Sequence, residues 1–170
     1  IAAISKEDEF KYKNFNQGSK TVTIPFGIDV FKYKFNVVSK NKKIKFFHLG
    51  AMDWKPNLEA VGWLLKEIWP EILHYNSKAE LHLAGKNMPK WLIDKRDKNV
   101  FNHGNVADAK DFMQKYDVML VPILSAGGIR VKIIEGMALG KTIISTKIGA
   151  EGLSYVNNEN ILIADSPEDF

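Results

Sequence analysis

The sequence predicts an α/β fold, a three-layer α/β/α sandwich whose middle layer is a doubly wound, Rossmann-like parallel sheet. Short apolar segments rich in β-branched and aromatic residues alternate with segments of helical periodicity, as in parallel sheets covered on both faces. Several expected strands end at a glycine or a proline, namely Gly50, Gly85, Gly104 and Pro122. The length of 170 residues, 45% of them hydrophobic, suits one domain with a substantial core. Such sheets bind ligands beyond the carboxyl ends of their strands.

The first β-α unit is expected early in the chain. Residues 44–49 form a buried strand that ends at Gly50. A long helix is expected at 57–75, because its apolar residues recur every three or four positions and form one stripe. We expect Trp69-Pro70 to kink or restart this helix, since proline has no N–H to donate and its ring clashes with the preceding turn.

The remaining elements continue the alternation of strands and helices. The expected strands are 79–84, 99–103, 117–121, 142–145 and 161–163. The expected helices are 89–95, 107–115 and 129–139. The last of these helices stops at Gly140, because glycine commonly terminates helices.

Both ends of the chain resemble parts of longer elements. Ile1 begins in what resembles the tail of a strand, and Ser5 is a candidate N-cap of a helix. At the other end, Ser166-Pro167-Glu168-Asp169 has the cap, the proline and the acidic residues of a helix start. We therefore expect the sequence to be cut from a longer protein at both ends.

The composition excludes several kinds of chemistry. The chain has no cysteine, which rules out disulfides, thiolate nucleophiles and cysteine-ligated metal sites. Its net charge of +4 comes from lysine, since Arg96 and Arg130 are the only arginines. Lys32 to Lys45 holds six lysines and no acid, which favours a solvated linker over contact with nucleic acid or an anionic membrane. No apolar run approaches the ~18 residues of a membrane span.

The segment Ser125–Glu135, between a strand and a helix, is the strongest candidate site. Gly127 and Gly128 let the backbone approach a ligand with exposed N–H groups. Arg130 and Lys132 place two cations in the first helical turn, where they oppose the helix dipole. An anion bound to the helix start and both side chains would resolve this conflict. We therefore predict a phosphate or diphosphate site in preference to a solvated loop with two surface cations.

A carboxylate lies within the same helix. Glu135 has apolar neighbours, and a buried carboxylate is costly without partners. Its expected partners are the hydroxyls of a ligand or Lys132 one turn earlier, with a surface salt bridge as the alternative. The segment Asp53–Asn57, which follows the first strand, either lines the cleft or is a connecting loop.

Other candidate motifs are incomplete. Gly136–Thr142 ends like a phosphate-binding P-loop, but has one residue too few between its glycines and follows a helix instead of preceding one. No G-x-G-x-x-G follows any strand, so a nicotinamide or flavin site lacks its signature. The four histidines lack metal-ligand spacing, so no metal site is predicted, and His48 and His82 are expected to be core or edge residues.

Several segments resemble, in order and spacing, the motifs of one enzyme family. They are Thr23–Asp29, Gly50–Asn57, Leu83–Gly85, Pro122–Ala138, Ile148–Leu153 and Leu162–Asp165. On these segments nearly the whole chain is similar to the carboxy-terminal half of retaining glycosyltransferases of the GT-B fold, most closely glycosyltransferase family 4 (glycosyl transferases group 1). The resemblance implies that residues 1–29 are a remnant of the acceptor domain with its linker. It implies that residues 30–170 are the nucleotide-sugar donor-binding domain, truncated at its carboxy-terminal end.

The resemblance also implies a reaction. The full enzyme would move a sugar, of hexosyl type, from a UDP- or GDP-linked donor to an acceptor hydroxyl with retention of configuration and without a cofactor. The acceptor would be a glycan or a lipid-linked molecule held by the missing domain. These features imply polysaccharide biosynthesis in the cytoplasm, with peripheral contact at the inner face of the membrane and no nucleic-acid partner. The isolated chain is expected to be inactive.

The family assigns roles to particular residues of the site. Cations offset the charge that builds on the diphosphate leaving group, so Arg130 and Lys132 are the catalytic candidates. Glu135, the second glutamate of an E-x7-E motif, would hold the ribose hydroxyls and is the third. The residues expected to bind the donor are Gly50, Lys55, Gly104, Asn105, Val106, Gly127 and Gly128.

The chain departs from the family pattern at two places. The first glutamate of E-x7-E is Gly127 here, which leaves the donor sugar undetermined. The family's arginine after the first-strand glycine is Ala51, and its lysine is at best displaced to Lys55. Two other classes stay open, a non-catalytic nucleotide- or sugar-binding module and a dinucleotide-dependent oxidoreductase domain.

Overall fold

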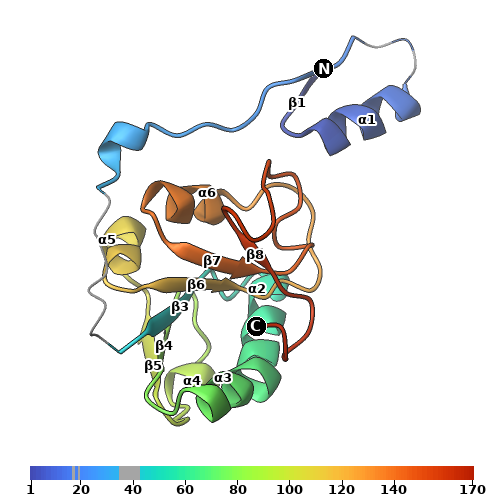
Figure 1. The fold of residues 1–170 in the computed structure, drawn as a ribbon. Coiled ribbons are helices and arrows are strands. Elements are labelled where there is room, and N and C mark those ends of the chain that lie inside the picture. Colours follow the sequence, from blue (N-terminus) through green and yellow to red (C-terminus); the bar gives the residue numbers. More distant parts are fainter. Residues whose placement is uncertain (17, 19, 35–42) are drawn as a thin grey trace.

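The computed structural model describes residues 1–16, 18, 20–34 and 43–170. Most of the lysine-rich stretch between Lys32 and Lys45 therefore lies outside the described residues. The described part contains a central α/β domain and a smaller amino-terminal unit, joined by an extended segment of chain (Figure 1).

Six parallel strands form the central sheet, in the order β5-β4-β3-β6-β7-β8 (Figure 1). They are β3 (Lys45–Leu49), β4 (Glu80–Ala84), β5 (Val100–Gly104), β6 (Val118–Val121), β7 (Thr142–Ser145) and β8 (Leu162–Ile163). The chain adds strands on one side of β3 and then returns to its other side with β6. This reversal defines a doubly wound, Rossmann-like sheet, so the predicted fold class is confirmed.

Helices cover both faces of the sheet (Figure 1). One face carries α5 (Ala109–Gln114) and α6 (Val131–Ala138). The other face carries α2 (Lys55–Trp63), α3 (Trp69–Tyr75) and α4 (Lys90–Ile93). Three layers therefore result, with a separate apolar cluster on each side of the sheet.

Side chains alternate between the two clusters because successive residues of a strand point to opposite faces. In β3, Phe47 packs on Phe112 of α5, whereas Phe46 packs edge-on against Trp69 of α3 with 6.0 Å between the ring centroids. Strand β3 thus contributes side chains to the apolar clusters on both faces of the sheet, and this packing holds its carboxyl end in place.

The long helix expected at 57–75 changes type along its length. α2 passes into a π-helical segment, η2 (Leu64–Ile68), which continues as α3. Pro70 stands in the first turn of α3, where it cannot donate to a carbonyl of the preceding turn. A wider π turn relieves the clash of its ring with that turn. The predicted restart at Trp69-Pro70 is confirmed, and the helix begins two residues earlier than expected, at Lys55.

Three helices are shorter than the sequence predicts, and one of them, expected at 107–115, is confined to α5, Ala109–Gln114. The helix expected at 89–95 is confined to α4, because the Asn102 amide of β5 donates to the carbonyls of Leu92 and Lys95 at 2.7 and 3.1 Å. The helix expected at 129–139 begins only at Val131, because Arg130 has a non-helical backbone with ψ of 87°. At the carboxy terminus, residues 166–169 form a turn in which the Asp169 N–H approaches the Ser166 carbonyl.

The amino-terminal unit is a small β-α-β arrangement that lies beside the central domain (Figure 1). It consists of β1 (Ala2–Ala3), α1 (Lys6–Phe15) and β2 (Val22–Thr23), and its two strands pair in parallel. Ser5 caps α1 as predicted, since its hydroxyl accepts the Asp8 N–H at 3.1 Å. The linker continues into a short 3-10 turn, η1 (Val30–Lys32).

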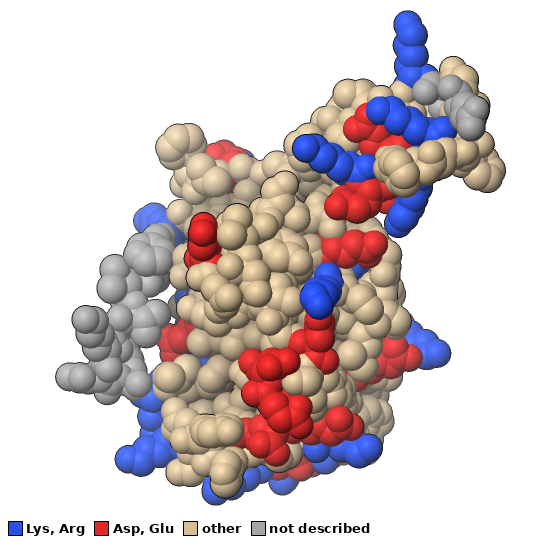
Figure 2. Space-filling model, turned by 45° about the vertical axis from the view of Figure 1, so that its right-hand side comes forward, with Lys and Arg blue, Asp and Glu red and all other residues tan. Residues whose placement is uncertain are grey.

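The basic side chains do not form one continuous surface on the face of the molecule drawn in Figure 2. Acidic side chains form a cluster low on this face, with basic side chains along its lower edge and others scattered above. The net positive charge of the chain therefore does not make this face a polyanion-binding surface. Within the described residues, no helix is both long and apolar enough to cross a membrane.

Candidate functional site

The candidate site lies at the carboxyl ends of β3 and β6, the two strands between which the winding direction reverses. Gly50 directly follows β3, and the loop 122–130 follows β6 before α6 begins. Loops leave this point in opposite directions, which opens a crevice in doubly wound sheets. The segments singled out in the sequence therefore converge on the topological switch point.

Glycines let the backbones of two neighbouring strand ends touch. A Cβ on Gly85 would lie 1.7 Å from the Gly50 carbonyl oxygen, which no structure tolerates. A Cβ on Gly50 would lie 2.6 Å from the side-chain amide of Asn57. Both glycines are thus required by close packing, and Gly50 lies at the crevice.

Lys132, in the first turn of α6, points back to the end of β3. Its Nζ donates to the Leu49 carbonyl at 2.9 Å and to Asn57 Oδ1 at 3.0 Å. The pKa of Lys132 is lowered to about 7, first by burial and then by the positive charge of Arg130. The ammonium is therefore an uncompensated charge that a bound anion would stabilise.

His48 lies beneath this cation, in β3. It is fully buried and its Nδ1 donates to the Leu120 carbonyl at 2.9 Å, while Nε2 has no partner among the described residues. Burial lowers the pKa of His48 to about 3, and Lys132 acts in the same direction. The prediction of a core histidine is confirmed, since the ring stays neutral and packed.

Arg130 joins two loops. Its guanidinium donates to the carbonyls of Gly127 at 2.8 Å, Ile148 at 2.6 Å and Gly149 at 3.3 Å. Glu151 lies 3.5 Å from it and offsets the burial that lowers the pKa of Arg130. Because Arg130 is 5% exposed, most of its donors are used within the protein.

The two loop glycines differ in what they do. Gly127 gives its carbonyl to Arg130, whereas Gly128 has a left-handed backbone with φ of +79°. A Cβ on either residue would meet nothing within 4 Å. The loop before α6 is therefore open, and only Gly128 is required by its backbone conformation.

A cavity of about 310 Å³ lies at the carboxyl ends of β3, β4 and β5. Gly50, Asn105 and Val106 line it, so three residues predicted to bind the donor face one space. Gly104 shapes this wall, because its left-handed backbone (φ +63°) turns the chain and its carbonyl accepts the Gly85 N–H at 2.8 Å.

Glu135 faces a second cavity of about 400 Å³ between α5, α6 and the linker. Tyr33 of the linker donates its hydroxyl to Glu135 Oε1 at 3.3 Å. Burial raises the pKa of Tyr33, and the Glu135 carboxylate raises it further. Ala109 lines both this cavity and the previous one, so the two spaces adjoin at the start of α5.

Lys55 lies at the rim of the site. Its exposed ammonium pairs with Glu59 at 3.6 Å along α2, and Glu59 accepts the Ser125 hydroxyl at 3.0 Å. Lys55 is thus connected to the loop after β6 through Glu59, and it does not join the buried cluster of Lys132 and Asn57.

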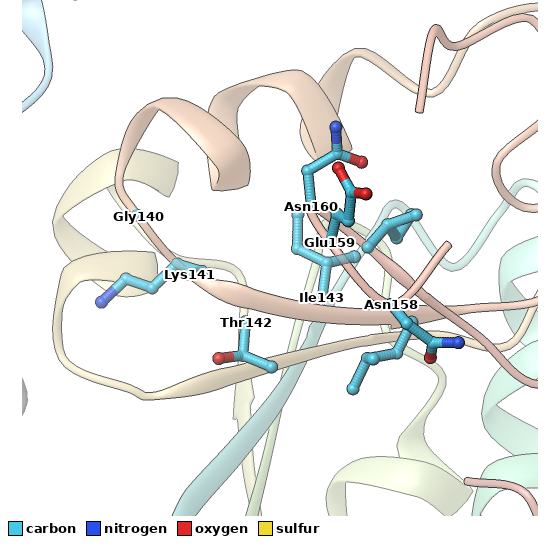
Figure 3. A pocket seen from close by; sticks show the side chains of 9 residues that line it. Gly140, Lys141, Thr142, Ile143, Asn158, Glu159 and Asn160 are labelled. Atoms are coloured by element: carbon cyan, nitrogen blue, oxygen red, sulfur yellow. The ribbon is translucent and has the colours of Figure 1, made fainter. Parts of the chain in front are cut away.

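A further cavity lies at the opposite edge of the sheet (Figure 3). It has a volume of about 320 Å³ and is formed by the start of β7 and the turn before β8. Its lining residues are Gly140, Lys141, Thr142, Ile143, Asn158, Glu159, Asn160, Ile161 and Leu162. None of the predicted site residues belongs to it.

Two of the histidines contact each other near the sheet edge. His82 Nδ1 lies 3.0 Å from His103 Nε2, and His82 stacks on Tyr116 with 4.2 Å between the rings. The pKa of His82 is lowered to about 4, first by burial and then by the neighbouring His103. Among the described residues, no group of three or more His, Asp or Glu side chains is arranged to hold a metal ion.

Comparison with known proteins identifies the family. A family model described as "Glycosyl transferases group 1" matches residues 43–170, which is most of the chain. The chain belongs to this family. The match covers every strand of the central sheet and all the residues of the switch point.

Solved structures agree with this membership at the level of the fold. Anabaena HepE, crystallised with UDP and glucose, superposes with a TM-score of 0.69 at 15% identity and covers 99% of this chain and 50% of that one. A Rickettsia africae glycosyltransferase gives 0.71 at 18% identity, with 99% and 50% covered. The chain is therefore a Rossmann-like domain of the kind found in GT-B glycosyltransferases.

A relative from Klebsiella pneumoniae is similar in sequence. It is named "Uncharacterized 44.6 kDa protein in cps region" and is 26% identical over 160 residues, which is 86% of this chain and 40% of that protein. The chain thus spans less than half of this relative and half of the two structures above.

Sequence reasoning did not single out two residues of the candidate site. Asn57 was placed only within a segment that either lines the cleft or connects elements, yet it is 4% exposed and contacts Lys132. A signal in the sequence that could have identified Asn57 is its place as a polar residue in the first turn of a helix that begins at the switch point. Tyr33 has no such signal, because it reaches Glu135 only through the folded path of the linker.

Proposed function

We propose that this chain is the donor-binding part of a retaining, hexosyl-type glycosyltransferase, which moves a sugar from a nucleoside-diphosphate sugar to an acceptor hydroxyl. The observation that supports this most is the Lys132 ammonium. It is held at the switch point by a carbonyl and an amide, with no carboxylate paired to it among the described residues. A diphosphate would supply the missing negative charge.

The diphosphate occupies the space between Gly50 and the start of α6. Lys132 donates to its oxygens, and Arg130 adds positive charge and holds the Gly127-Gly128 loop in place. As the anomeric carbon–oxygen bond breaks, the bonding electron pair passes to the β-phosphate oxygen. Fixed cations stabilise that charge and thereby lower the barrier. The acceptor oxygen bonds to the anomeric carbon on the same face, and its proton passes to the departing diphosphate.

The nucleoside occupies the two adjoining cavities. The base lies in the cavity lined by Asn105 and Val106, against the turn at Gly104. The ribose hydroxyls donate to Glu135, whose cavity meets the first at Ala109. Leu49, whose carbonyl accepts from Lys132, also lines the first cavity, so the cation adjoins this space. Lys55 lies on the solvent-exposed side of the donor site.

The amino-terminal residues 1–29 belong to the acceptor domain and its linker, and residues 30–170 to the donor domain. Large apolar side chains of this unit stand exposed, including Phe10, Phe15 and Ile24, as expected for a segment that packs against more protein. The acceptor, a glycan or a lipid-linked molecule, binds outside this chain. The isolated chain is therefore inactive.

The relatives support the donor class and the setting. Anabaena HepE binds UDP, which favours UDP over GDP as the donor nucleotide, and the Klebsiella relative is encoded in a cps region. We infer polysaccharide biosynthesis in the cytoplasm, with peripheral contact at the inner face of the membrane. The reaction needs no cofactor besides the donor.

Isothermal titration calorimetry with UDP, GDP and ADP tests the nucleotide site. We expect one diphosphate to bind, and Glu135→Gln to weaken it by about tenfold through the loss of charge-assisted hydrogen bonds to ribose. Val30→Ala, at an exposed linker residue outside the cavities, serves as the control. Absence of heat with all three nucleotides would overturn the assignment, as would equal binding by the Glu135 variant.

A further inference from the structure

Asn57 joins the loop after β3 to the start of α6. Its side chain is buried, and both halves of the amide are engaged: Nδ2 donates to the Ala51 carbonyl at 2.9 Å, and Oδ1 accepts from Lys132 Nζ at 3.0 Å. A flipped amide would set oxygen against oxygen and nitrogen against ammonium, so only this orientation satisfies both contacts. The absent Cβ of Gly50 leaves the space for it.

The contact decides where the Lys132 ammonium points. An ammonium has three donors, and the Leu49 carbonyl and Asn57 Oδ1 take two of them. The third has no protein partner among the described residues. Because the lysine stem has four rotatable carbons, an ammonium held by only one acceptor would sample several positions.

We propose that Asn57 is a positioning residue, which holds Lys132 so that its third N–H meets a diphosphate oxygen of the donor. This inference rests on the proposed function. A neutral amide suits the task better than a carboxylate, since it orients the ammonium without cancelling its charge. Arg130, whose own partners are loop carbonyls and Glu151, adds a second positive charge nearby.

A double-mutant cycle on this chain, measured by calorimetry with UDP, tests the inference. We expect Asn57→Ala to weaken UDP binding by about tenfold and Lys132→Met by about ten- to a hundredfold. In the double variant, Asn57→Ala should add almost nothing, because its effect passes through Lys132. A merely structural role for Asn57 would give losses that multiply.

Two further variants make the result independent of folding defects. Asn57→Asp keeps the shape of the side chain but pairs its charge with Lys132, so it should weaken UDP binding at least as much as Asn57→Ala. Asn157→Ala removes another side-chain amide, whose Oδ1 accepts the Ile163 N–H in the turn before β8, outside both donor cavities, and should leave UDP affinity unchanged.

The outcomes separate the two proposals. If the wild-type chain binds neither UDP nor GDP, the proposed function fails and the role of Asn57 fails with it. Two results would overturn only the role of Asn57, provided that the wild type binds UDP and Lys132→Met weakens that binding. In one, the Asn57 variants bind UDP like the wild type; in the other, the losses of affinity from Asn57→Ala and Lys132→Met multiply in the double variant.

Discussion

Two lysines at opposite ends of the sheet, one partly buried and one buried, show how differently the same residue can be used. Lys132 lies at the carboxyl ends of the strands, and Lys141 lies at the start of β7. Lys141 donates to the carbonyls of Tyr116 at 2.7 Å and Gln114 at 3.3 Å, and its side chain points away from the turn at 158–160 (Figure 3).

The two lysines differ most in the charged groups that surround them. Burial lowers the pKa of both, but Asp117 acts in the opposite direction at Lys141, whereas Arg130 adds to the effect at Lys132. Lys141 is therefore compensated within the protein, and Lys132 is not. A partly buried cation that the fold leaves uncompensated is unfavourable, which favours a role in binding a ligand.

The largest expected effect concerns the backbone contact at the carboxyl edge. Gly85→Ala should lower the free energy of unfolding by at least about 4 kcal/mol, because its Cβ would collide with the Gly50 carbonyl. Gly140→Ala, at the amino edge, should cost only about 1 kcal/mol for its left-handed backbone. Urea unfolding of both variants measures the difference. Equal losses would mean that the Gly50–Gly85 contact relaxes easily.

Acid should destabilise the chain through its neutral buried histidines. The pKa values of His48 and His82 in the folded state are about 3 and 4, below the unfolded value of about 6.5. Their contribution is complete above pH 6.5 and is lost as the pH falls toward those values. We expect each histidine to lower the free energy of unfolding by about 2 kcal/mol between pH 6.5 and pH 5.

The matched variants are His48→Gln and His82→Gln, studied by thermal melting from pH 7 to pH 5. Each should flatten the decline in Tm over this interval, since one group no longer gains a proton on unfolding. An unchanged slope in both variants would contradict the assignment of neutral histidines.

The two lysines should differ in UDP binding. Lys132→Met should weaken UDP by about ten- to a hundredfold, because it removes a charge-assisted hydrogen bond. Lys141→Met should leave the affinity within about twofold while lowering Tm, since two carbonyls lose their donor. Calorimetry and thermal melting of both variants check this, and a similar loss of affinity in the two would remove the contrast between them.

The smallest effect is expected at the rim. Lys55→Ala should weaken UDP by about two- to threefold, because the ammonium is exposed and already paired with Glu59. A loss as large as that of Lys132→Met, in the same calorimetric measurement, would show that the phosphate is bound mainly from α2 and not from α6.

Much of this architecture can be predicted from the sequence, because it depends on local sequence patterns. Alternating strands and helices with glycine at the strand ends predict the doubly wound sheet, and Pro70 predicts the restart of the long helix. Lys132 and Glu135 are found because charged residues near a glycine-rich helix start are unusual. The bounds of α4 were missed because a distant side chain, Asn102, ends that helix.

The partners of the charged residues could not be predicted. Arg130 and Lys132 are two positions apart and look alike in the sequence. One donates to carbonyls of a loop almost twenty residues later, and the other to the end of β3 and to Asn57. These partners depend on tertiary packing, which local patterns do not record.

The measurement that tests the central assignment most directly is the pKa of Lys132, followed by NMR of ¹³C-labelled lysine in the free chain and with saturating UDP. Lys141 serves as the internal reference, and Lys132→Met identifies the signal. We expect the Lys132 pKa to rise from about 7 by at least one unit when UDP binds, while Lys141 stays unchanged. A Lys132 pKa that does not move while UDP is bound would contradict the assignment of this lysine to the diphosphate.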